Sequence, residues 1–206
     1  MGKHHGSIDQ KILSRITAQG RGWVFTPADF LDLGSRNAVD LALSRNARSG
    51  AIRKLAHGLY DCPRRDPRLG LLSPSTDDIA KALQGRDASR LQPSGAHAAN
   101  ILGLSDQVPM RTVFLTDGRS RTIRLGRRTI LLKKTTPRQM TTIGRMSGTV
   151  IQALRWLGRR NVDDKIVSIL RRRLTPLDKS DLLKDIRYAP AWVGEVMRCV
   201  AEDQPS

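Results

Sequence analysis

The residue types best suited to a specific chemical task lie at the start of a helix that we expect to begin after Ser35. Arg36 and Asn37 carry the groups that pair with the edges of guanine and adenine in the major groove of DNA. Asp40 and Ser44 extend this polar face. The opposite face is apolar at helical spacing and consists of Val39, Ala42, Leu43 and Ala47. The pattern predicts a helix that brings its first two turns to base edges.

Further polar residues after this helix start are placed to contact the phosphates beside the groove. They are Arg45, Arg48, Arg53, Lys54 and His57. An alternative is that the whole set is a solvated polar face, on which Arg36 pairs with Asp40 one turn further on. We favour DNA binding over binding of protein alone, because both the polar face of this helix and the segment after it are basic.

A second candidate site is the stretch 111–138, where nine basic residues stand against one acid, Asp117. The nine are Arg111, Arg119, Arg121, Arg124, Arg127, Arg128, Lys133, Lys134 and Arg138. Alternate residues of a strand share a face, so we expect a continuous positive surface here. The alternative is that these charges protect strand edges against pairing. Such a surface could hold DNA, RNA or an acidic protein.

No residue cluster points to catalysis, and we expect no enzyme, no metal and no cofactor. There are four histidines: His4, His5, His57 and His97. None has a cysteine, histidine or carboxylate at metal-ligand spacing. The paired acids at 77–78 and 163–164 fall at expected helix starts, where capping explains them. Ser94 and Gly95 lack the G-x-S-x-G context of a nucleophile elbow.

The elements that must position the first candidate site predict a winged helix-turn-helix over residues 1–62. Ser7 and Gln10 form a capping-box pattern before the first helix, and Thr26 caps a second helix predicted over 28–33. The third helix follows Ser35. The predicted β-elements are a short run at 23–25 and a hairpin with strands at 52–55 and 59–61.

The stretch 61–75 contains three prolines and predicts a linker between two domains. The second domain is expected over 74–206, with a small antiparallel or mixed sheet and helical cover. Its strands are predicted at 113–115, 122–124 and 128–132. Amphipathic helices follow from residue 150 onwards. The fold class is therefore α+β: a winged helix, then an α/β domain that ends in helices.

The composition agrees with a polyanion-binding protein. The 206 residues include 36 basic and 19 acidic ones, so the net charge is +17, with +6 in 1–70, +8 in 71–147 and +3 in 148–206. Apolar residues make up 39%, which is enough for packed cores. The apolar runs are too short for a transmembrane helix or a secretory signal. Two isolated cysteines, Cys62 and Cys199, fit a reducing cytosol, so we expect a cytoplasmic protein.

Several short runs are collectively characteristic of one family. They are Gly50-Ala51-Ile52-Arg53, Gly58-Leu59-Tyr60, Leu91-Gln92-Pro93-Ser94-Gly95, Ala98-Ala99-Asn100-Ile101-Leu102-Gly103-Leu104, Gln107-Val108-Pro109, Leu115-Thr116-Asp117-Gly118, Thr135-Thr136-Pro137-Arg138 and Val150-Ile151-Gln152-Ala153-Leu154. With them the chain resembles AbiEi-type antitoxins from about residue 7 to about residue 160. It departs from the expected pattern at Asn46, an inward position of the third helix, while Leu41 lies on the less buried side.

The resemblance implies an antitoxin of a toxin–antitoxin or phage-defence operon. Such a protein binds operator DNA to repress its own promoter and counteracts a nucleotidyltransferase-like toxin; a dimer on DNA is compatible with this role. The alternative is that the basic middle segment neutralises the toxin by direct contact and DNA binding is secondary. A third candidate is an RNA-acting factor, disfavoured because aromatic residues make up only 4% of the chain. No membrane partner is expected.

Overall fold

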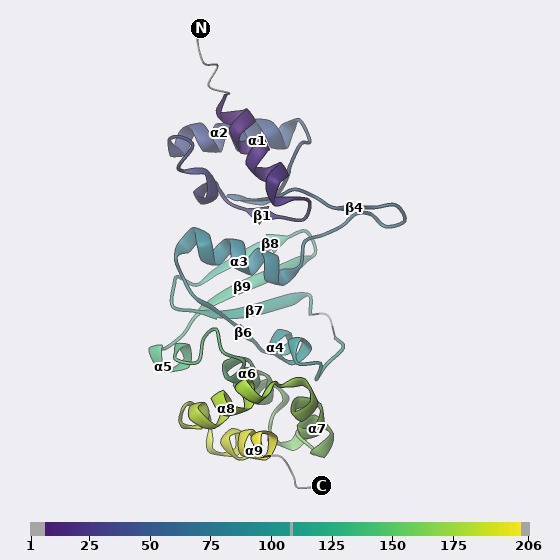
Figure 1. Ribbon diagram of the computed structural model, residues 1–206, viewed down its shortest axis with the longest axis vertical. Helices are drawn as coiled ribbons and strands as arrows, with labels where there is room; N and C mark the ends of the chain where they lie inside the picture. Colours follow the sequence, from purple (N-terminus) through teal and green to yellow (C-terminus); the bar gives the residue numbers. More distant parts are fainter. Residues whose placement is uncertain (1–6, 108, 203–206) are drawn as a thin grey trace. The chain divides into compact units, whose positions relative to one another are not determined.

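The computed structural model describes residues 7–107 and 109–202, and the chain forms two compact units, Met1–Ser89 and Arg90–Ser206 (Figure 1). Helices and small sheets occur in both units, which confirms the predicted α+β class. In the described ranges, every helix is too short or too polar to cross a lipid bilayer. His4, His5 and Val108 of the run 107–109 lie outside the described residues.

The helices of the first unit begin at the predicted caps. In α1 (Ile8–Gln19), the hydroxyl of Ser7 accepts from the amide of Gln10, and the Gln10 side chain accepts from the amide of Ser7. In α2 (Arg36–Arg48), the hydroxyl of Ser35 accepts from the amide of Ala38. Local side-chain capping therefore sets where both helices start.

The predicted second helix is shorter than expected and is not an α-helix. It is the 3₁₀ segment η1 (Pro27–Phe30), held by bonds that span three residues, such as the one from the amide of Leu31 to the carbonyl of Ala28. The carboxylate of Asp29 accepts from the amide of Thr26 at 2.7 Å and caps this single turn. Turn structure then leads to Gly34, so the prediction of a helix over 28–33 was wrong in type and length.

A three-stranded antiparallel sheet completes the centre of the first unit. Its strands are β1 (Val24–Phe25), β2 (Arg53–Ala56) and β3 (Leu59–Asp61), in the order β1-β3-β2. The predicted hairpin is thus present, with a register irregularity between Lys54 and Ala56. The core beneath it includes Ile12, Ile16, Phe25, Phe30, Val39 and Leu43. Phe25 and Phe30 meet edge to face, with ring centroids 5.5 Å apart.

The expected linker contains structure of its own. It forms a hairpin of β4 (Arg65–Asp66) and β5 (Gly70–Leu71), which projects from the first unit in Figure 1. The turn is held by Asp66, whose carboxylate accepts from the amides of Arg68 and Leu69. The next helix, α3 (Thr76–Asp87), packs against β1 and η1. The first unit therefore extends to Ser89, beyond the expected boundary at 62–74.

The sheet of the second unit is mixed, which decides between the two forms that the sequence left open. Its order is β6-β7-β9-β8, where β7 and β9 run parallel and the other pairs are antiparallel. The strands are β6 (Leu91–Ser94), β7 (Arg111–Thr116), β8 (Arg121–Leu125) and β9 (Arg128–Lys134). The short helices α4 (Ala96–Ile101) and α5 (Pro137–Met140) follow β6 and β9.

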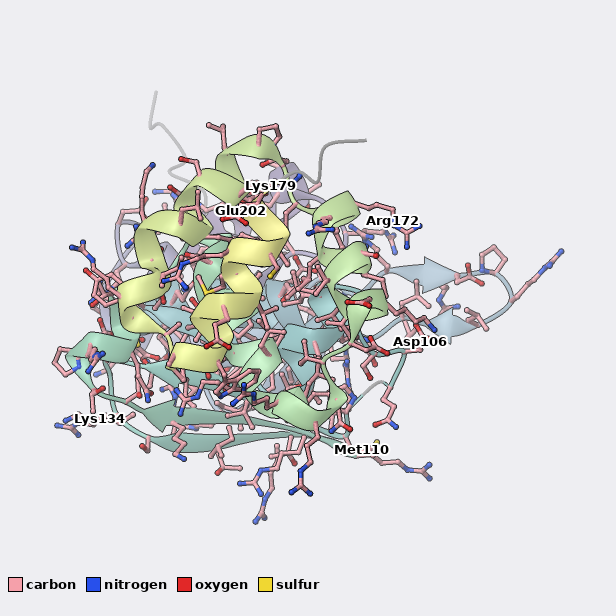
Figure 2. The ribbon with its side chains drawn as sticks, turned by 90° about the horizontal axis from the view of Figure 1, so that it is seen from below. Asp106, Met110, Lys134, Arg172, Lys179 and Glu202 are labelled. Atoms are coloured by element: carbon pink, nitrogen blue, oxygen red, sulfur yellow. The ribbon has the colours of Figure 1, made fainter. Side chains whose placement is uncertain are left out.

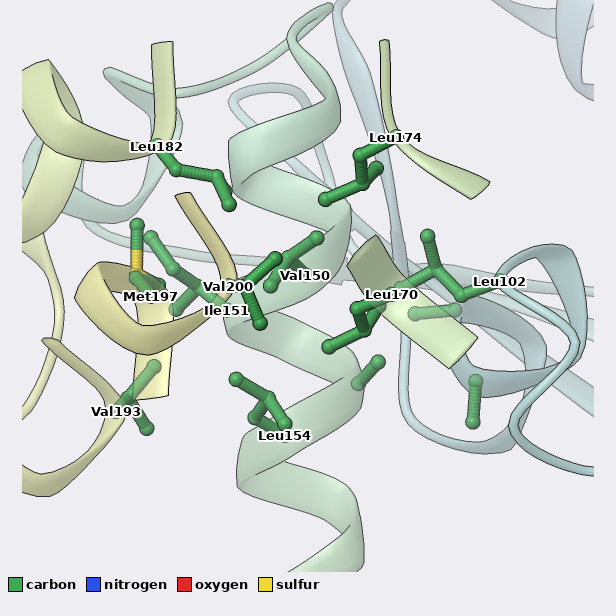
Figure 3. Close-up of a cluster of buried hydrophobic side chains, with 13 residues drawn as sticks. Leu102, Val150, Ile151, Leu154, Leu170, Leu174, Leu182, Val193, Met197 and Val200 are labelled. Atoms are coloured by element: carbon green, nitrogen blue, oxygen red, sulfur yellow. The ribbon is translucent and has the colours of Figure 1, made fainter. Parts of the chain in front are cut away.

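The C-terminal part of the second unit is helical, as predicted. It consists of α6 (Met146–Leu157), η2 (Arg159–Asn161), α7 (Asp164–Arg173), α8 (Pro176–Asp185), η3 (Ile186–Tyr188) and α9 (Ala191–Ala201). Their apolar faces meet in a cluster built around Val150, Leu154, Leu170, Leu182 and Met197 (Figure 3). The middle of α6 is buried on all sides, because it packs against α4, β6, α8 and α9.

Candidate nucleic-acid interface

The side chains predicted to read base edges lie on the exposed face of α2 near its start. Arg36 and Asn37 are exposed, while Asp40 and Ser44 are half-buried. Nε of Arg36 donates to Oδ2 of Asp40 at 3.0 Å, so the ion pair considered from the sequence is formed. An exposed pair of this spacing contributes only about 0.3–0.5 kcal/mol. Asp40 therefore does not prevent Arg36 from turning to another acceptor.

Asn46, at an inward position of α2 where an apolar residue was expected, has a local explanation. Asn46 is buried, as its inward position requires, and its Nδ2 donates to the carbonyl of Ala42 at 2.9 Å. The side chain thus satisfies a donor within α2 itself, while Leu41 is exposed on the outer face. The predicted orientation of α2 therefore holds, with its polar face outward.

Two arginines predicted to contact phosphates have partners inside the first unit. Nε and Nη2 of Arg45 donate to the two carboxylate oxygens of Asp9 at 3.2 and 2.7 Å. The hydrogen bond to Asp9 raises the pKa of Arg45. Nη2 of Arg48 donates to the hydroxyl of Ser44 at 3.4 Å. Both arginines are nevertheless exposed, so they keep donors on the side that faces solvent.

Arg53 is held more firmly and serves the fold. Its Nε and Nη2 donate to Asp61 at 2.9 and 2.5 Å, and Nη2 also donates to the carbonyl of Leu72 at 2.8 Å. The Asp61 side chain is 1% exposed and that of Arg53 is 27% exposed. The hydrogen bond to Asp61 raises the pKa of Arg53 despite its partial burial. Because these donors are used inside the unit, the geometry gives no support to the predicted phosphate contact of Arg53.

The hairpin after α2 adds exposed polar residues and one cation that the sequence did not indicate. Lys54 and His57 are exposed, as their predicted phosphate contacts require. Arg86 of α3 approaches the turn, where Nη1 would be 3.8 Å from a Cβ added to Gly58. Burial lowers the pKa of Arg86, and the nearby charge of Arg36 lowers it further. Arg86 could not be assigned to this region from the sequence, because only tertiary packing brings α3 to the hairpin.

In the second unit, the strand register divides the basic stretch 111–138 between two faces of the sheet. Arg124 of β8 pairs with Thr129 of β9, which pairs in turn with Arg111 of β7. One face therefore carries Arg111, Arg124 and Lys133. The other carries Arg121, Arg128 and Lys134, on the side where Ile123, Ile130 and Leu132 are buried. Arg119 and Arg127 lie in turns and Arg138 in α5. The expectation of one continuous surface from all nine residues is thus corrected.

We call the face with Arg111, Arg124 and Lys133 the open face. All three side chains are exposed, and within residues 7–107 and 109–202 no carboxylate pairs with them. Figure 2 shows nitrogen-tipped side chains projecting from this side of the sheet, between the labelled Lys134 and Met110. Unlike Arg36 and Arg45 of α2, which pair with Asp40 and Asp9, these cations have charges that no acid of the described residues neutralises.

A groove of about 350 Å³ lies between the open face and α6. Its lining includes Ser94, Lys133, Gln139, Gln152, Arg155 and Trp156. Arg155 is exposed, and the indole of Trp156, which is 44% exposed, lies near Gly95. A second groove of about 290 Å³ shares Arg155 and Gln139 with the first and adds Arg138 and Tyr188. This site was not predicted from the sequence. The one sequence signal that could have indicated it is a cation followed by a tryptophan at the end of an apolar helix.

Three of the residues considered for catalysis, His97, Asp78 and Asp163, make structural contacts. Among the described residues, no group of three or more histidines, cysteines and carboxylates could hold a metal. His97 is buried and meets the ring of Phe114 edge on, with centroids 5.2 Å apart. Asp163 caps α7 by accepting from the amide of Ile166, and Asp78 accepts from the hydroxyl of Ser75 at the start of α3.

Comparison with known proteins places these features in a family context. Residues 11–182 match the model of a family described as a family of unknown function (DUF6088). No curated protein matches the sequence at a significant level. The matched region includes α2, the open face and the groove beside Trp156, so the candidate interfaces of both units lie within it.

Proposed function

Starting from a chain that belongs to the DUF6088 family, whose function is unknown, we propose that this protein is a DNA-binding antitoxin that represses its own operon. The geometry of the first unit supports the DNA-binding part. The antitoxin part rests on the resemblance of the sequence to AbiEi-type antitoxins. The observation that carries the DNA-binding part is the exposed polar start of α2, directly before a hairpin with exposed Lys54.

The connectivity of the first unit supports a winged helix. Three helical segments, α1, η1 and α2, precede the β2–β3 hairpin, and β1 closes the sheet by pairing with β3. In such a domain the last helix enters the major groove and the hairpin lies beside it on the backbone. This arrangement supports a base-reading role for α2 and a phosphate contact for Lys54.

Relative energies support the base-reading role of Arg36. Its exposed pair with Asp40 is worth only about 0.3–0.5 kcal/mol, whereas a bidentate contact from arginine to guanine discriminates by about 1–3 kcal/mol. A guanine edge can therefore replace Asp40 at little cost. Asn37 can form the corresponding bidentate contact with adenine.

The experiment that tests this part compares a duplex taken from upstream of the gene with a shuffled duplex. Replacing Arg36 and Asn37 together by alanine should reduce the preference for the upstream duplex at least tenfold, because two base contacts are lost. Fluorescence anisotropy measures both affinities. The double variant Lys11→Ala with Ser14→Ala, exposed on α1, serves as the control and should keep the preference. Unchanged binding of both duplexes by the α2 variant would exclude this use of the helix.

The antitoxin part is tested by co-expression with the product of the adjacent gene. We expect that gene product to arrest growth and this protein to restore it. Restored growth without a stable complex of the two purified proteins supports an antitoxin that acts without contact. A stable complex favours the alternative, in which the basic middle segment binds the toxin directly. DNA binding without any rescue of growth would leave a repressor but no antitoxin.

A further inference from the structure

The groove beside Trp156 has the composition of a site for an anionic, aromatic ligand. Lys133 reaches it from β9 and Arg155 from α6, so positive charge comes from two elements on opposite sides. Neither residue forms an ion pair with a carboxylate within the described chain. No acid is among the described residues that line the groove or its neighbour. Both cations are therefore available to a ligand that carries phosphate.

Trp156 supplies the second half of such a site. Nearly half of its side chain is exposed, although tryptophan is ordinarily buried when it serves only the core. Arg155 lines the same groove from the same helix, so an aromatic surface and a cation border one space at the end of α6. Stacking on an exposed aromatic ring strengthens binding of any base, because every base presents a flat aromatic face.

Polar groups around the tryptophan can contact the edge of a stacked base. Ser94 donates its hydroxyl to Oε1 of Gln152 at 3.2 Å, which fixes the oxygen of that amide and orients its NH₂ group. Gln139, which also lines the groove, accepts a hydrogen bond from the hydroxyl of Thr135. These amides and hydroxyls offer both donors and acceptors, as base edges require.

We propose that this groove binds a single strand of nucleic acid, with a base stacked on Trp156 and flanking phosphates on Lys133 and Arg155. A duplex keeps its bases stacked inside the double helix and cannot offer one to the indole, whereas a single strand can. Because Arg155 and Gln139 also line the second groove, the strand can continue towards Arg138 and Tyr188. This site is distinct from the face of α2 to which duplex binding is attributed.

The test measures binding of the full chain to labelled oligonucleotides about 12 nucleotides long. The probes are oligouridine, oligothymidine and a duplex of equal length. Reversing Lys133 and Arg155 to glutamate should weaken binding of the single strands at least tenfold, because two phosphate contacts become repulsive. Trp156→Ala should weaken it at least fivefold and Trp156→Phe much less, since phenylalanine still stacks. For each of these variants, the fold-loss of affinity for the duplex should be less than half of the fold-loss for the single strands.

The matched control reverses Lys165 and Arg172, two exposed cations of α7. Figure 2 shows Arg172 on the far side of the unit from Lys134, the neighbour of Lys133 at the end of β9. The control changes the net charge by the same amount and should leave single-strand binding within twofold of the wild type. Thermal unfolding by circular dichroism checks that all variants fold.

Each outcome decides for or against the proposal. Binding of one or both single strands that is lost in the groove variants supports it; preference for oligouridine points to RNA, and equal binding points to a site that ignores the sugar. The proposal would be overturned if the α7 control lost as much single-strand affinity as the groove variants. It would also be overturned if the duplex or an acidic peptide displaced the labelled single strand as well as the unlabelled single strand does. Because the Arg36 and Asn37 variant leaves this groove intact, failure of operator binding and failure of single-strand binding are separable results.

Discussion

Gly148 stands in the first turn of α6, close to Thr142 and to Gln92 of β6. A Cβ added there would lie 2.6 Å from the carbonyl oxygen of Thr142 and 2.7 Å from Oε1 of Gln92. Both atoms belong to buried residues, one of them a backbone atom, so the contact cannot be relieved by moving a flexible side chain into solvent. The absence of a side chain at this position is thus a packing requirement.

We expect Gly148→Ala to destabilise the protein by about 1–3 kcal/mol, the usual cost of overpacking a core. Urea unfolding followed by circular dichroism measures the change. Gly85 of α3 is the matched control, since it is also in a helix and a Cβ there would meet nothing within 4 Å. Gly85→Ala should stabilise by about 0.5–1 kcal/mol. A similar change in both variants would show that the contacts of Gly148 have no energetic effect.

At the scale of elements, one side chain joins the start of β6 to the end of β7. The amide and the Nε of Arg90 both donate to the carboxylate of Asp117 at 2.8 Å, beyond the last paired residues of the two strands. The hydrogen bonds from the side chain and the backbone of Arg90 lower the pKa of Asp117 from its ordinary value of 3.8. The ionised carboxylate is therefore favoured in the folded state.

This shift predicts a dependence of stability on pH. The pKa of Asp117 is lower in the folded state than in the unfolded state. Its contribution to the stability of the folded state is therefore complete above about pH 4 and is lost as the pH falls through the folded pKa. Asp117→Asn should lower the urea midpoint at neutral pH, and the difference from the wild type should shrink in acid. Asp106→Asn, at an exposed carboxylate, is the control. A difference that stays constant from neutral pH to acid would contradict the assignment.

Elements whose signals are local could be predicted from the sequence. Ser7 with Gln10, and Ser35, mark the starts of α1 and α2 because a cap depends on residues three positions apart. The segment after Thr26 also has a cap, but its bonds close over three residues and form a 3₁₀ turn, a difference that periodicity over a few residues does not reveal.

Features that depend on strand register or on tertiary packing could not be predicted. The separation of Arg124 from Arg128 onto two faces follows from the register of β8 with β9, where a shift by one residue would exchange the faces. The groove at Trp156 likewise forms only because α6 packs beside the sheet, and no local sequence pattern predicts that packing. Arg53 had the chemistry of a phosphate contact, and only the fold shows Asp61 buried against it.

At the scale of the whole molecule, the charge is distributed unevenly between the two units. Residues 1–89 contain 14 basic and 9 acidic residues, a net charge of +5, and residues 90–206 contain 22 and 10, a net charge of +12. In the first unit, acids pair with Arg36, Arg45 and Arg53. The unit for which we propose duplex binding is therefore the less charged one, and specificity there has to come from geometry.

The salt dependence of duplex binding distinguishes a cation that contacts phosphate, as proposed for Lys54, from a cation that stabilises the fold, as Arg53 does. Each phosphate contact with a duplex contributes about 0.9 to the slope of log K against log salt concentration. Lys54→Ala should reduce this slope by about one contact. Arg53→Met should leave the slope unchanged at temperatures where the variant is folded, but lower its thermal stability, because Asp61 remains buried without a partner. If the Arg53 variant had a reduced slope and unchanged thermal stability, Arg53 would be a phosphate contact after all.

The strand order β6-β7-β9-β8 also bears on how the second unit assembles. β8 and β9 are neighbours in sequence and close over the two residues Gly126 and Arg127, so their hairpin can form within microseconds. β9 must then dock in parallel beside β7, which places β8 at the outer edge. Docking pairs segments further apart in sequence and carries the larger loop-closure entropy. We infer that the two long-range ladders of β7, with β9 and with β6, limit the folding rate of the sheet, and that the open face and its groove exist only after both have formed.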